Sequence, residues 1–270
     1  MKGDLNNEKP EVRLRAFRAI NEPDICELFV EGHARVLTSI GVTKVTSSKN
    51  DWMHNPAVFV IVVESANDPK KIYGGARVHV SGGTEPLPIE QATCKMDPGV
   101  HELVWEYAQY GTGEICGLWN SHELAGYGIG TPLLIRTLIA ISSQLGLQSL
   151  FALCAPYTVK PVVNCGMVLA ETIGNKGTFY YPKLDLIATA MILKDVSALS
   201  LALGEERDKI FQMRANPNSL KIHELKNKDI TIDFELGIPG LEQWDLREII
   251  ASAREEFMKK GVMEYNINYL

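Results

Sequence analysis

The sequence predicts a mixed α/β protein, of the α+β type, in which a mostly antiparallel central sheet is flanked by helices. Residues 58–63 read VFVIVV, and such a continuous β-branched run is typical of a strand buried on both faces. A DPKK turn separates this run from a second extended segment, 71–83, which predicts an antiparallel hairpin. A third segment, 112–121, has strand character and is followed by a glycine-rich turn and the most apolar helix of the chain, from residue 131.

The other elements follow from local patterns. In residues 11–19 apolar side chains alternate with arginines, which predicts a first strand with one solvated face. Pro23 and Asp24 begin a helical pattern that Gly41 can end, and residues 42–56 have the composition of a loop. Further along, the pattern predicts a Pro-broken linker from 83, a helix over 100–110, strands over 149–156 and 184–193, and a short helix or turn ending at Gly166.

The pattern changes at Val196. The segment 197–217 is typical of a helix that stops at Pro217, and 228–236 alternates as a strand with two different faces. An amphipathic helix is expected over 242–261. We therefore expect a first domain over residues 1–195 and a helix–strand–helix C-terminal extension over residues 196–270, with no internal repeat.

Composition excludes several classes of function. The chain of 270 residues has 27 Lys+Arg and 33 Asp+Glu, a net charge of −6 that argues against a nucleic-acid groove. The longest apolar stretch, 131–143, contains Arg136 and is shorter than the ~20 residues that span a bilayer. No signal-peptide pattern opens the sequence, so a cytoplasmic protein without a membrane span is expected. The five cysteines lack CxxC spacing and predict buried, reduced thiols, with no metal site and no disulfide framework.

The turn at residues 125–130 is the most informative motif. Gly126, Gly128 and Gly130 alternate with Tyr127 and Ile129 at the start of the apolar helix. Glycines leave backbone N–H groups uncovered there, where the helix dipole favours a diphosphate or another anion. A tight strand-to-helix turn without a ligand explains the same residues. A dinucleotide fold is disfavoured, because it requires GxGxxG and an acidic residue ~20 positions later.

This region resembles the GNAT superfamily of acyl-CoA-dependent N-acyltransferases. Their signature is Gln/Arg-x-x-Gly-x-Gly/Ala between a strand and a helix, and Gly128-Ile129-Gly130 matches its glycine half. The order of predicted elements over residues 11–195 is also similar. Within the superfamily, the layout looks most like acyl-homoserine-lactone synthases and long-chain N-acyl amino acid synthases. Those enzymes have a strand end similar to Gly74-Gly75-Ala76-Arg77, a helical insertion, and a strand that begins with Glu, here Glu114.

The resemblance implies transfer of an acyl group from acetyl-CoA, a longer acyl-CoA or an acyl carrier protein to the amine of a small, amino-acid-like acceptor. It implies direct attack in a ternary complex, with no cysteine nucleophile, and a homodimer is possible. Three positions depart from the synthase pattern, namely Gly117, Ala125 and Val162, where Arg, Gln/Arg and Tyr are found. A lactone-type synthase with an S-adenosylmethionine acceptor and a non-catalytic acyl-CoA-binding protein are therefore the alternatives.

Amine attack on a thioester needs a base, an oxyanion donor and a way to release the thiolate. Glu114 is the expected base, with His79, His122 and Glu123 as second choices; a solvated Glu114 at a strand end is the alternative. The resembled fold has a bulge near Gly117, so a backbone N–H there is the expected oxyanion donor. Tyr157 is the candidate acid for the thiolate.

The remaining site residues concern binding. Arg77 is expected to bind an acceptor carboxylate, unless it is an exposed, solvated arginine, and Trp119 is expected to line the acyl pocket, unless it belongs to the core. Strand alternation places Cys116 and Leu118 on the face of Glu114, and Ile115, Gly117 and Trp119 on the other. The expected acyl-CoA contacts are Cys116, Leu118, Ala125, Gly126, Tyr127, Gly128, Ile129, Gly130 and Thr131.

Overall fold

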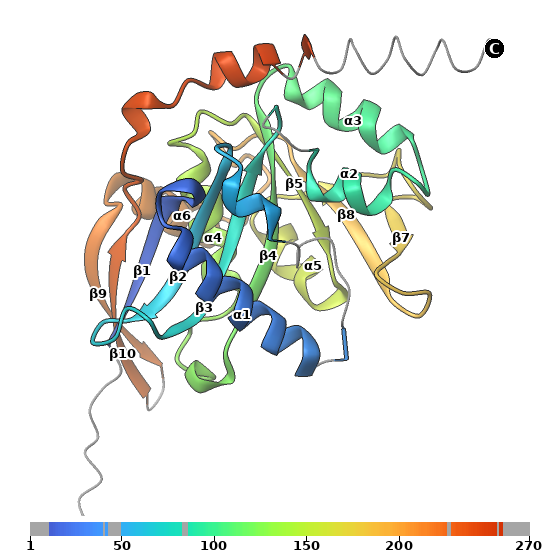
Figure 1. The fold of residues 1–270 in the computed structure, drawn as a ribbon. Coiled ribbons are helices and arrows are strands. Elements are labelled where there is room, and N and C mark those ends of the chain that lie inside the picture. The colour runs from blue at the N-terminus through green and yellow to red at the C-terminus, as the bar shows by residue number, and fades with distance from the viewer. Residues whose placement is uncertain are drawn as a thin grey trace, which may run out of the picture.

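A ten-stranded sheet organises the chain in the computed structural model, which describes residues 11–39, 41–42, 50–82, 86–225, 228–252 and 254–255 (Figure 1). Its order is β6-β8-β5-β4-β3-β2-β1-β10-β9, and β7 also pairs with β8. The strands are β1 (Glu11–Arg18), β2 (Val58–Ser65), β3 (Ile72–Val80), β4 (Thr112–Asn120), β5 (Ser149–Cys154), β6 (Val168–Leu169), β7 (Thr178–Tyr180), β8 (Ile187–Leu193), β9 (Asn218–Leu225) and β10 (Lys228–Glu235).

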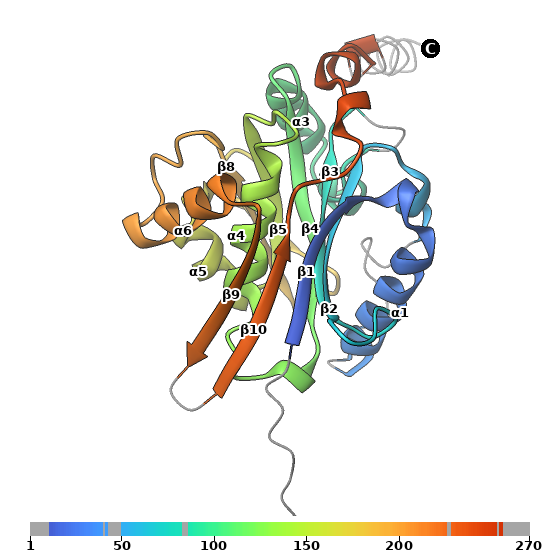
Figure 2. The same ribbon diagram turned by 90° about the vertical axis from the view of Figure 1, so that its left-hand side faces the viewer.

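Helices cover both faces of this sheet, with α1 on one side and α4 to α6 on the other (Figure 2). They are α1 (Pro23–Ser39), α2 (Pro88–Thr93), α3 (Gly99–Ala108), α4 (Thr131–Ser142), α5 (Pro156–Asn164) and α6 (Gly204–Ala215), and residues 246–252 are also helical. The main apolar core lies between the sheet and α4, because Leu134, Leu138 and Ile139 are fully buried there. The predicted fold class is confirmed: most strand pairs are antiparallel, and the exceptions are β4–β5 and β1–β10.

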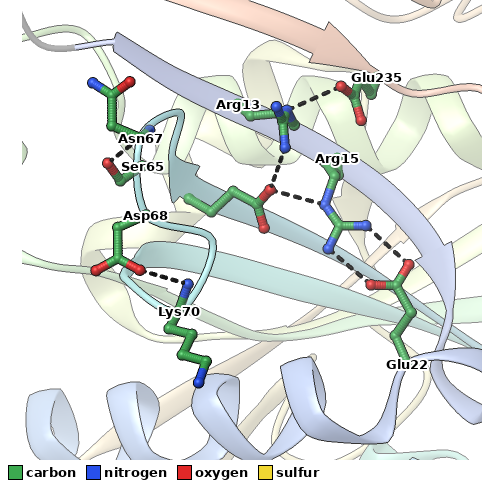
Figure 3. A network of polar contacts seen from close by, with 9 residues as sticks. Arg13, Arg15, Glu22, Ser65, Asn67, Asp68, Lys70 and Glu235 are labelled. Atoms are coloured by element: carbon green, nitrogen blue, oxygen red, sulfur yellow. Dashed lines mark hydrogen bonds and ion pairs between the residues drawn. The ribbon is translucent and has the colours of Figure 1, made fainter.

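The C-terminal region extends the main sheet. β10 pairs in parallel with β1, and β9 forms the edge beyond it. Figure 3 shows Arg13 and Arg15 in a polar network with Glu22 and Glu235, and both guanidinium groups also donate to the buried Glu64 of β2 at 3.1 Å. This network joins β1, β2 and β10 through charged hydrogen bonds.

Several short elements differ from the sequence prediction. α2, β6, β7 and β9 were not expected, and α6 begins at Gly204 rather than near residue 197. The residues before α6 form turns instead, and Leu199 has a positive φ of 52° that a helix does not allow. The expected C-terminal helix is described only in part, and its residues after 255 lie outside the described chain.

β4 and β5 separate part of the way along their length. Their parallel pairing joins Thr112 to Ser149, Gly113 to Leu150 and Glu114 to Phe151, and the register ends there. Beyond Glu114 the two strands carry backbone groups that are not paired across this junction. The central sheet is therefore open at one end, between the middle of β4 and the C-terminal end of β5.

Candidate active site

A cleft with a volume of about 150 Å³ occupies the opening between β4 and β5. Its walls come from five elements, α1, β4, α4, β5 and α5, so the cleft passes through the sheet from one helical layer to the other. The lining residues are His33, Ile115, Cys116, Gly117, Leu118, Ile135, Ala152, Leu153, Cys154, Ala155, Tyr157, Thr158 and Val162.

A β-bulge at Gly117 shapes the wall that β4 contributes. Gly75 of β3 pairs with Trp119, but Arg77, two residues later, pairs with Cys116, so β4 has one extra residue between these pairs. Gly117 has a φ of +61°, and a Cβ there would lie 2.8 Å from the Arg77 guanidinium. Glycine is required by both the backbone conformation and the space. The predicted bulge is confirmed.

The bulge corrects the predicted faces of β4. Simple alternation assigned Trp119 to the face opposite Cys116, but the extra residue reverses the alternation beyond Gly117. The Trp119 ring packs against Phe29 of α1, with 5.8 Å between ring centroids, on the face that also holds Arg77. Leu118 packs instead against the core on the α4 side.

Arg77 is fully buried, with an exposed fraction of 0%, so the expectation of an exposed, solvated arginine is wrong. Its guanidinium carbon lies 4.1 Å from the centroid of the Trp52 ring and 5.5 Å from that of Phe29. Burial lowers the pKa of Arg77 from its ordinary value. Arginine stays protonated in proteins near neutral pH, so the guanidinium is a cation. A fixed positive charge therefore lies directly behind the bulge, within the α1 side of the sheet.

Glu114 is buried rather than solvated at a strand end. Its side chain is 2% exposed, and Oε2 accepts a 2.6 Å hydrogen bond from the backbone N–H of Ile89 in α2. Desolvation raises the pKa of Glu114 to about 8, although the Ile89 hydrogen bond and the Arg77 charge act in the opposite direction. Glu114 is not one of the residues that line the cleft, so its expected role as base stays a prediction.

The second-choice bases lie apart from the cleft. His79 pairs with Glu114 across β3 and β4 and is buried, and desolvation holds the pKa of His79 well below its ordinary value. His122 and Glu123 are exposed, and Glu123 forms a 2.7 Å ion pair with Lys71. None of these three lines the cleft.

Sequence reasoning missed His33. This residue lies on α1, is 5% exposed, and lines the cleft together with Cys116 and Gly117. Desolvation, followed by the Arg77 charge, lowers the pKa of His33 to about 4. Helical spacing in α1 could have identified His33 as an inward residue, but the residues of β4, β5 and α5 that line the cleft with it are distant in the sequence and gave no signal.

The thiols and phenol of the cleft have different environments. Desolvation raises the pKa of Cys116 and of Cys154 to about 12, which keeps both thiols protonated near neutral pH. Tyr157, at the start of α5, is 69% exposed and contributes to the rim of the cleft. Trp119 is 3% exposed and packs in the α1 core, which favours the core alternative over a place in the cleft wall.

The glycine turn lies between β4 and α4. Gly126 and Gly128 have positive φ values of 84° and 78°, and Gly130 is the N-cap of α4. In the described part of the chain, no hydrogen bond is donated by the backbone N–H of Gly128, Ile129, Gly130 or Thr131. A Cβ at Gly130 would meet only Pro132 Cδ at 3.8 Å, so the approach to these N–H groups is open on that side.

The turn is anchored from within. The N–H groups of Ala125 and Tyr127 donate to the carbonyls of His122 and Leu124, and the Ile129 side chain is buried in the main core. These contacts fix the conformation of the turn. The backbone N–H groups of residues 128–131 then lie at the N-terminus of α4, where the helix dipole favours an anion.

Two general features concern the residues that the structure describes. They contain no group of three or more His, Cys, Asp or Glu placed to hold a metal ion. None of the helices in these ranges has the length and apolar character that crossing a membrane requires.

Comparison with known proteins adds the fold relationship. No protein-family model matches the chain, and no curated protein matches it in sequence. A similar solved structure is FeeM, an N-acyl amino acid synthase from uncultured soil microbes, at 16% identity and a TM-score of 0.53; the match covers 72% of this chain and 97% of that one. The lactone synthase LasI matches at 11% identity and a TM-score of 0.49 over 71% of this chain and 93% of that chain. The chain therefore shares the fold of the N-acyl amino acid synthase FeeM over the matched region, which agrees with the fold that the resemblance implied.

Proposed function

We propose that the protein transfers an acyl group from acyl-CoA, or from an acyl carrier protein, to the amine of a small acceptor that bears a carboxylate. The observation that carries this proposal is the cleft between β4 and β5, which begins where their pairing ends at Glu114 and lies against the Gly117 bulge. A thioester lying between the two strands would take the place of the missing strand pairing.

The donor's diphosphate would bind at the glycine turn. Backbone N–H groups from Gly128 to Thr131 are available there, and the N-terminus of the twelve-residue α4 adds a favourable dipole. Because the same turn leads directly from β4 into α4, a donor bound there can extend its thioester arm along β4 into the cleft.

The thioester carbonyl would be polarised by backbone N–H groups at the bulge. Beyond Glu114 no strand pairing joins β4 to β5, and the bulged residues Cys116 and Gly117 line the cleft. Donors fixed in a strand need no reorganisation as the negative charge develops on the oxygen, which is the basis of oxyanion stabilisation.

The acceptor would enter from the α1 side. Arg77 provides a buried positive charge behind the bulge, and its field favours an anionic group on the acceptor, such as the carboxylate of an amino acid. The high pKa values of Cys116 and Cys154 disfavour a thiolate nucleophile. Direct attack of the amine on the bound thioester is therefore the mechanism that we propose, and an acyl-enzyme is not required.

A non-catalytic acyl-CoA-binding protein is the second candidate. It is favoured by one observation, the absence of Glu114 from the lining of the cleft. Both candidates keep the glycine turn and the cleft, so they agree on donor binding and differ in turnover.

The test combines binding with thiol release. Purified protein is titrated with CoA and with acyl-CoAs of several chain lengths, and free thiol is then measured with a panel of amino acids and other amines. The proposal predicts saturable binding and a release of thiol that depends on the acceptor. It also predicts an N-acyl product that mass spectrometry detects. Binding without thiol release across the panel would support the second candidate, and absence of binding would contradict both.

A further inference from the structure

His33 is the basic side chain that reaches the cleft from the acceptor side. α1 packs against β3 and β4, and His33 forms part of the cleft wall opposite the residues of β5 and α5. The other titratable side chains that line the cleft are Cys116, Cys154 and Tyr157. Among them, the His33 imidazole is neutral at pH 7 and keeps one ring nitrogen with a lone pair that can accept a proton, whereas both thiols are protonated.

The imidazole of His33 is held in a defined position. The Phe29 ring, one helical turn earlier, makes an edge contact with it at 6.1 Å between centroids. The neighbouring Gly32 lies so close to the Trp119 ring that a Cβ would be 2.1 Å from it, which fixes the distance between α1 and β4. A catalytic group on a rigid helix that is packed this closely is positioned without a large loss of entropy.

Its surroundings determine its charge state. From β3 the Arg77 cation disfavours a second positive charge, and burial acts in the same direction, so the pKa of about 4 leaves His33 neutral at pH 7. From β4, Cys116 is a neutral thiol, and Glu114, two residues away, is mostly protonated below its pKa of about 8. From α5, Tyr157 lies at the rim.

We propose that His33 takes the proton from the acceptor amine as its nitrogen attacks the thioester carbon. This inference rests on the proposed function and names the base for it. The nitrogen forms a bond to the carbonyl carbon while one ring nitrogen of His33 receives the amine proton. The C–S bond then breaks, the electron pair leaves with sulfur, and the imidazolium returns the proton to the thiolate. The products are an amide and the free thiol, and His33 ends neutral.

The same environment favours the second half of this cycle. An imidazolium beside buried Arg77 is a strong acid, because two positive charges are close together in a desolvated site. It therefore gives its proton readily to a departing thiolate, since even a cysteine thiol has an ordinary pKa of about 8.5. One side chain can thus perform both transfers, and the exposed Tyr157 is not needed as the acid.

The test compares His33→Gln with His54→Gln. Gln has a similar size but is not basic, and His54 is an exposed histidine outside the cleft. We expect His33→Gln to lower kcat at least about 100-fold, the scale of general base catalysis, with the Kd for acyl-CoA changed less than twofold. His54→Gln should match the wild type. In a second variant, His33→Ala, added imidazole should restore part of the turnover, which a purely structural role would not allow.

The outcomes separate this inference from the proposed function. Undiminished turnover in His33→Gln, or a loss in His33→Ala that imidazole does not restore, would overturn the role of His33 while acyl transfer stands. If the wild type binds acyl-CoA but releases no thiol with any acceptor, the proposed function fails, and the role of His33 fails with it.

Discussion

The carboxyl of Glu114 in β4 accepts a 2.6 Å hydrogen bond from the backbone N–H of Ile89 in α2. This contact ties the α2–α3 insertion to the strand that forms one wall of the cleft. A carboxyl group in such a place is costly when charged, which explains why burial raises the pKa of Glu114 to about 8. Burial of this carboxyl therefore links the stability of the fold to pH, and the hydrogen bond from Ile89 acts in the opposite direction.

Stability should fall as the pH rises from 6.5 to 8. The pKa of Glu114 is raised on folding from about 4.5 to about 8, so the folded state holds more protons in this range and loses stability as they dissociate. The slope approaches about 1.4 kcal/mol per pH unit. The titration of His33 makes stability rise with pH instead, because the pKa of His33 is lowered on folding. This contribution is confined to the range between about pH 4 and pH 6.5.

Urea denaturation at several pH values measures this slope. Glu114→Gln should remove it while preserving the hydrogen bond to Ile89, since the amide oxygen of Gln also accepts. The two cysteines of the cleft, with pKa values of about 12, titrate outside the range. An identical slope in wild type and Glu114→Gln would show that the buried carboxyl is not linked to stability.

Turnover at pH 7 should survive Glu114→Gln. Glu114 is mostly protonated at this pH and does not line the cleft, so it is poorly placed to receive a proton from the acceptor. We expect kcat to change less than about threefold, well below the ~100-fold expected when a general base is lost. A loss of that larger size with unchanged acyl-CoA binding would assign the base to Glu114, as the sequence analysis predicted.

Gly117→Ala should destabilise the protein by ~2 kcal/mol or more. Alanine is strained at a φ of +61°, and its Cβ would lie 2.8 Å from the Arg77 guanidinium. Gly41→Ala is a matched control, because Gly41 has a φ of +72° with no atom within 4 Å of the added Cβ. Thermal unfolding should show the larger loss for Gly117→Ala. Equal losses of stability in the two variants would mean that the contact with Arg77 adds nothing to the destabilisation.

Thr131→Asp should separate donor binding from stability. Thr131 is the first residue of α4, where a carboxylate stabilises the helix dipole by about 0.5 kcal/mol but repels a diphosphate. The Kd for CoA should rise at least about tenfold while the free energy of unfolding stays equal or increases. Thr131→Asn, which is neutral, should bind within a fewfold of the wild type. Calorimetric titration measures both variants, and unchanged binding in Thr131→Asp would place the diphosphate elsewhere.

Glu64→Ala should lower the free energy of unfolding by about 2 kcal/mol, the scale of lost hydrogen bonds to charged groups. Glu64 is buried and accepts from both Arg13 and Arg15, which keep only their more exposed partners Glu235 and Glu22 when Glu64 is removed. Glu31→Ala is the control, because Glu31 forms only an exposed pair with Arg35, worth at most about 0.5 kcal/mol. Urea titration compares them. Similar effects for both variants would contradict a structural role for the Glu64 network.

The sequence predicted the elements that local pattern determines. The apolar run of β2, the hairpin with β3 and the glycine turn before α4 are encoded by neighbouring residues, so they were predicted with the correct partners. The bulge was expected because the resembled fold has one near Gly117, and glycine permits the positive φ found there. The side chains after it were assigned to the wrong faces, because alternation alone does not include the extra residue.

Packing between residues that are distant in the sequence determined the features that the sequence did not predict. Arg77 is polar in sequence and was interpreted as exposed or ligand-bound, but Trp52 and Phe29, from other elements, bury it. His33 belongs to the cleft only because α1 packs on β4, which no local pattern reports. The short strands β6 and β7 were missed because two or three residues carry too little periodicity.

A crystal structure with CoA or a non-hydrolysable acyl-CoA tests the central claim most directly. The account predicts diphosphate oxygens within hydrogen-bond distance of the N–H groups from Gly128 to Thr131, with the sulfur between β4 and β5 beside Gly117. A ligand bound at another surface, with the β4–β5 cleft empty at saturating concentration, would contradict it.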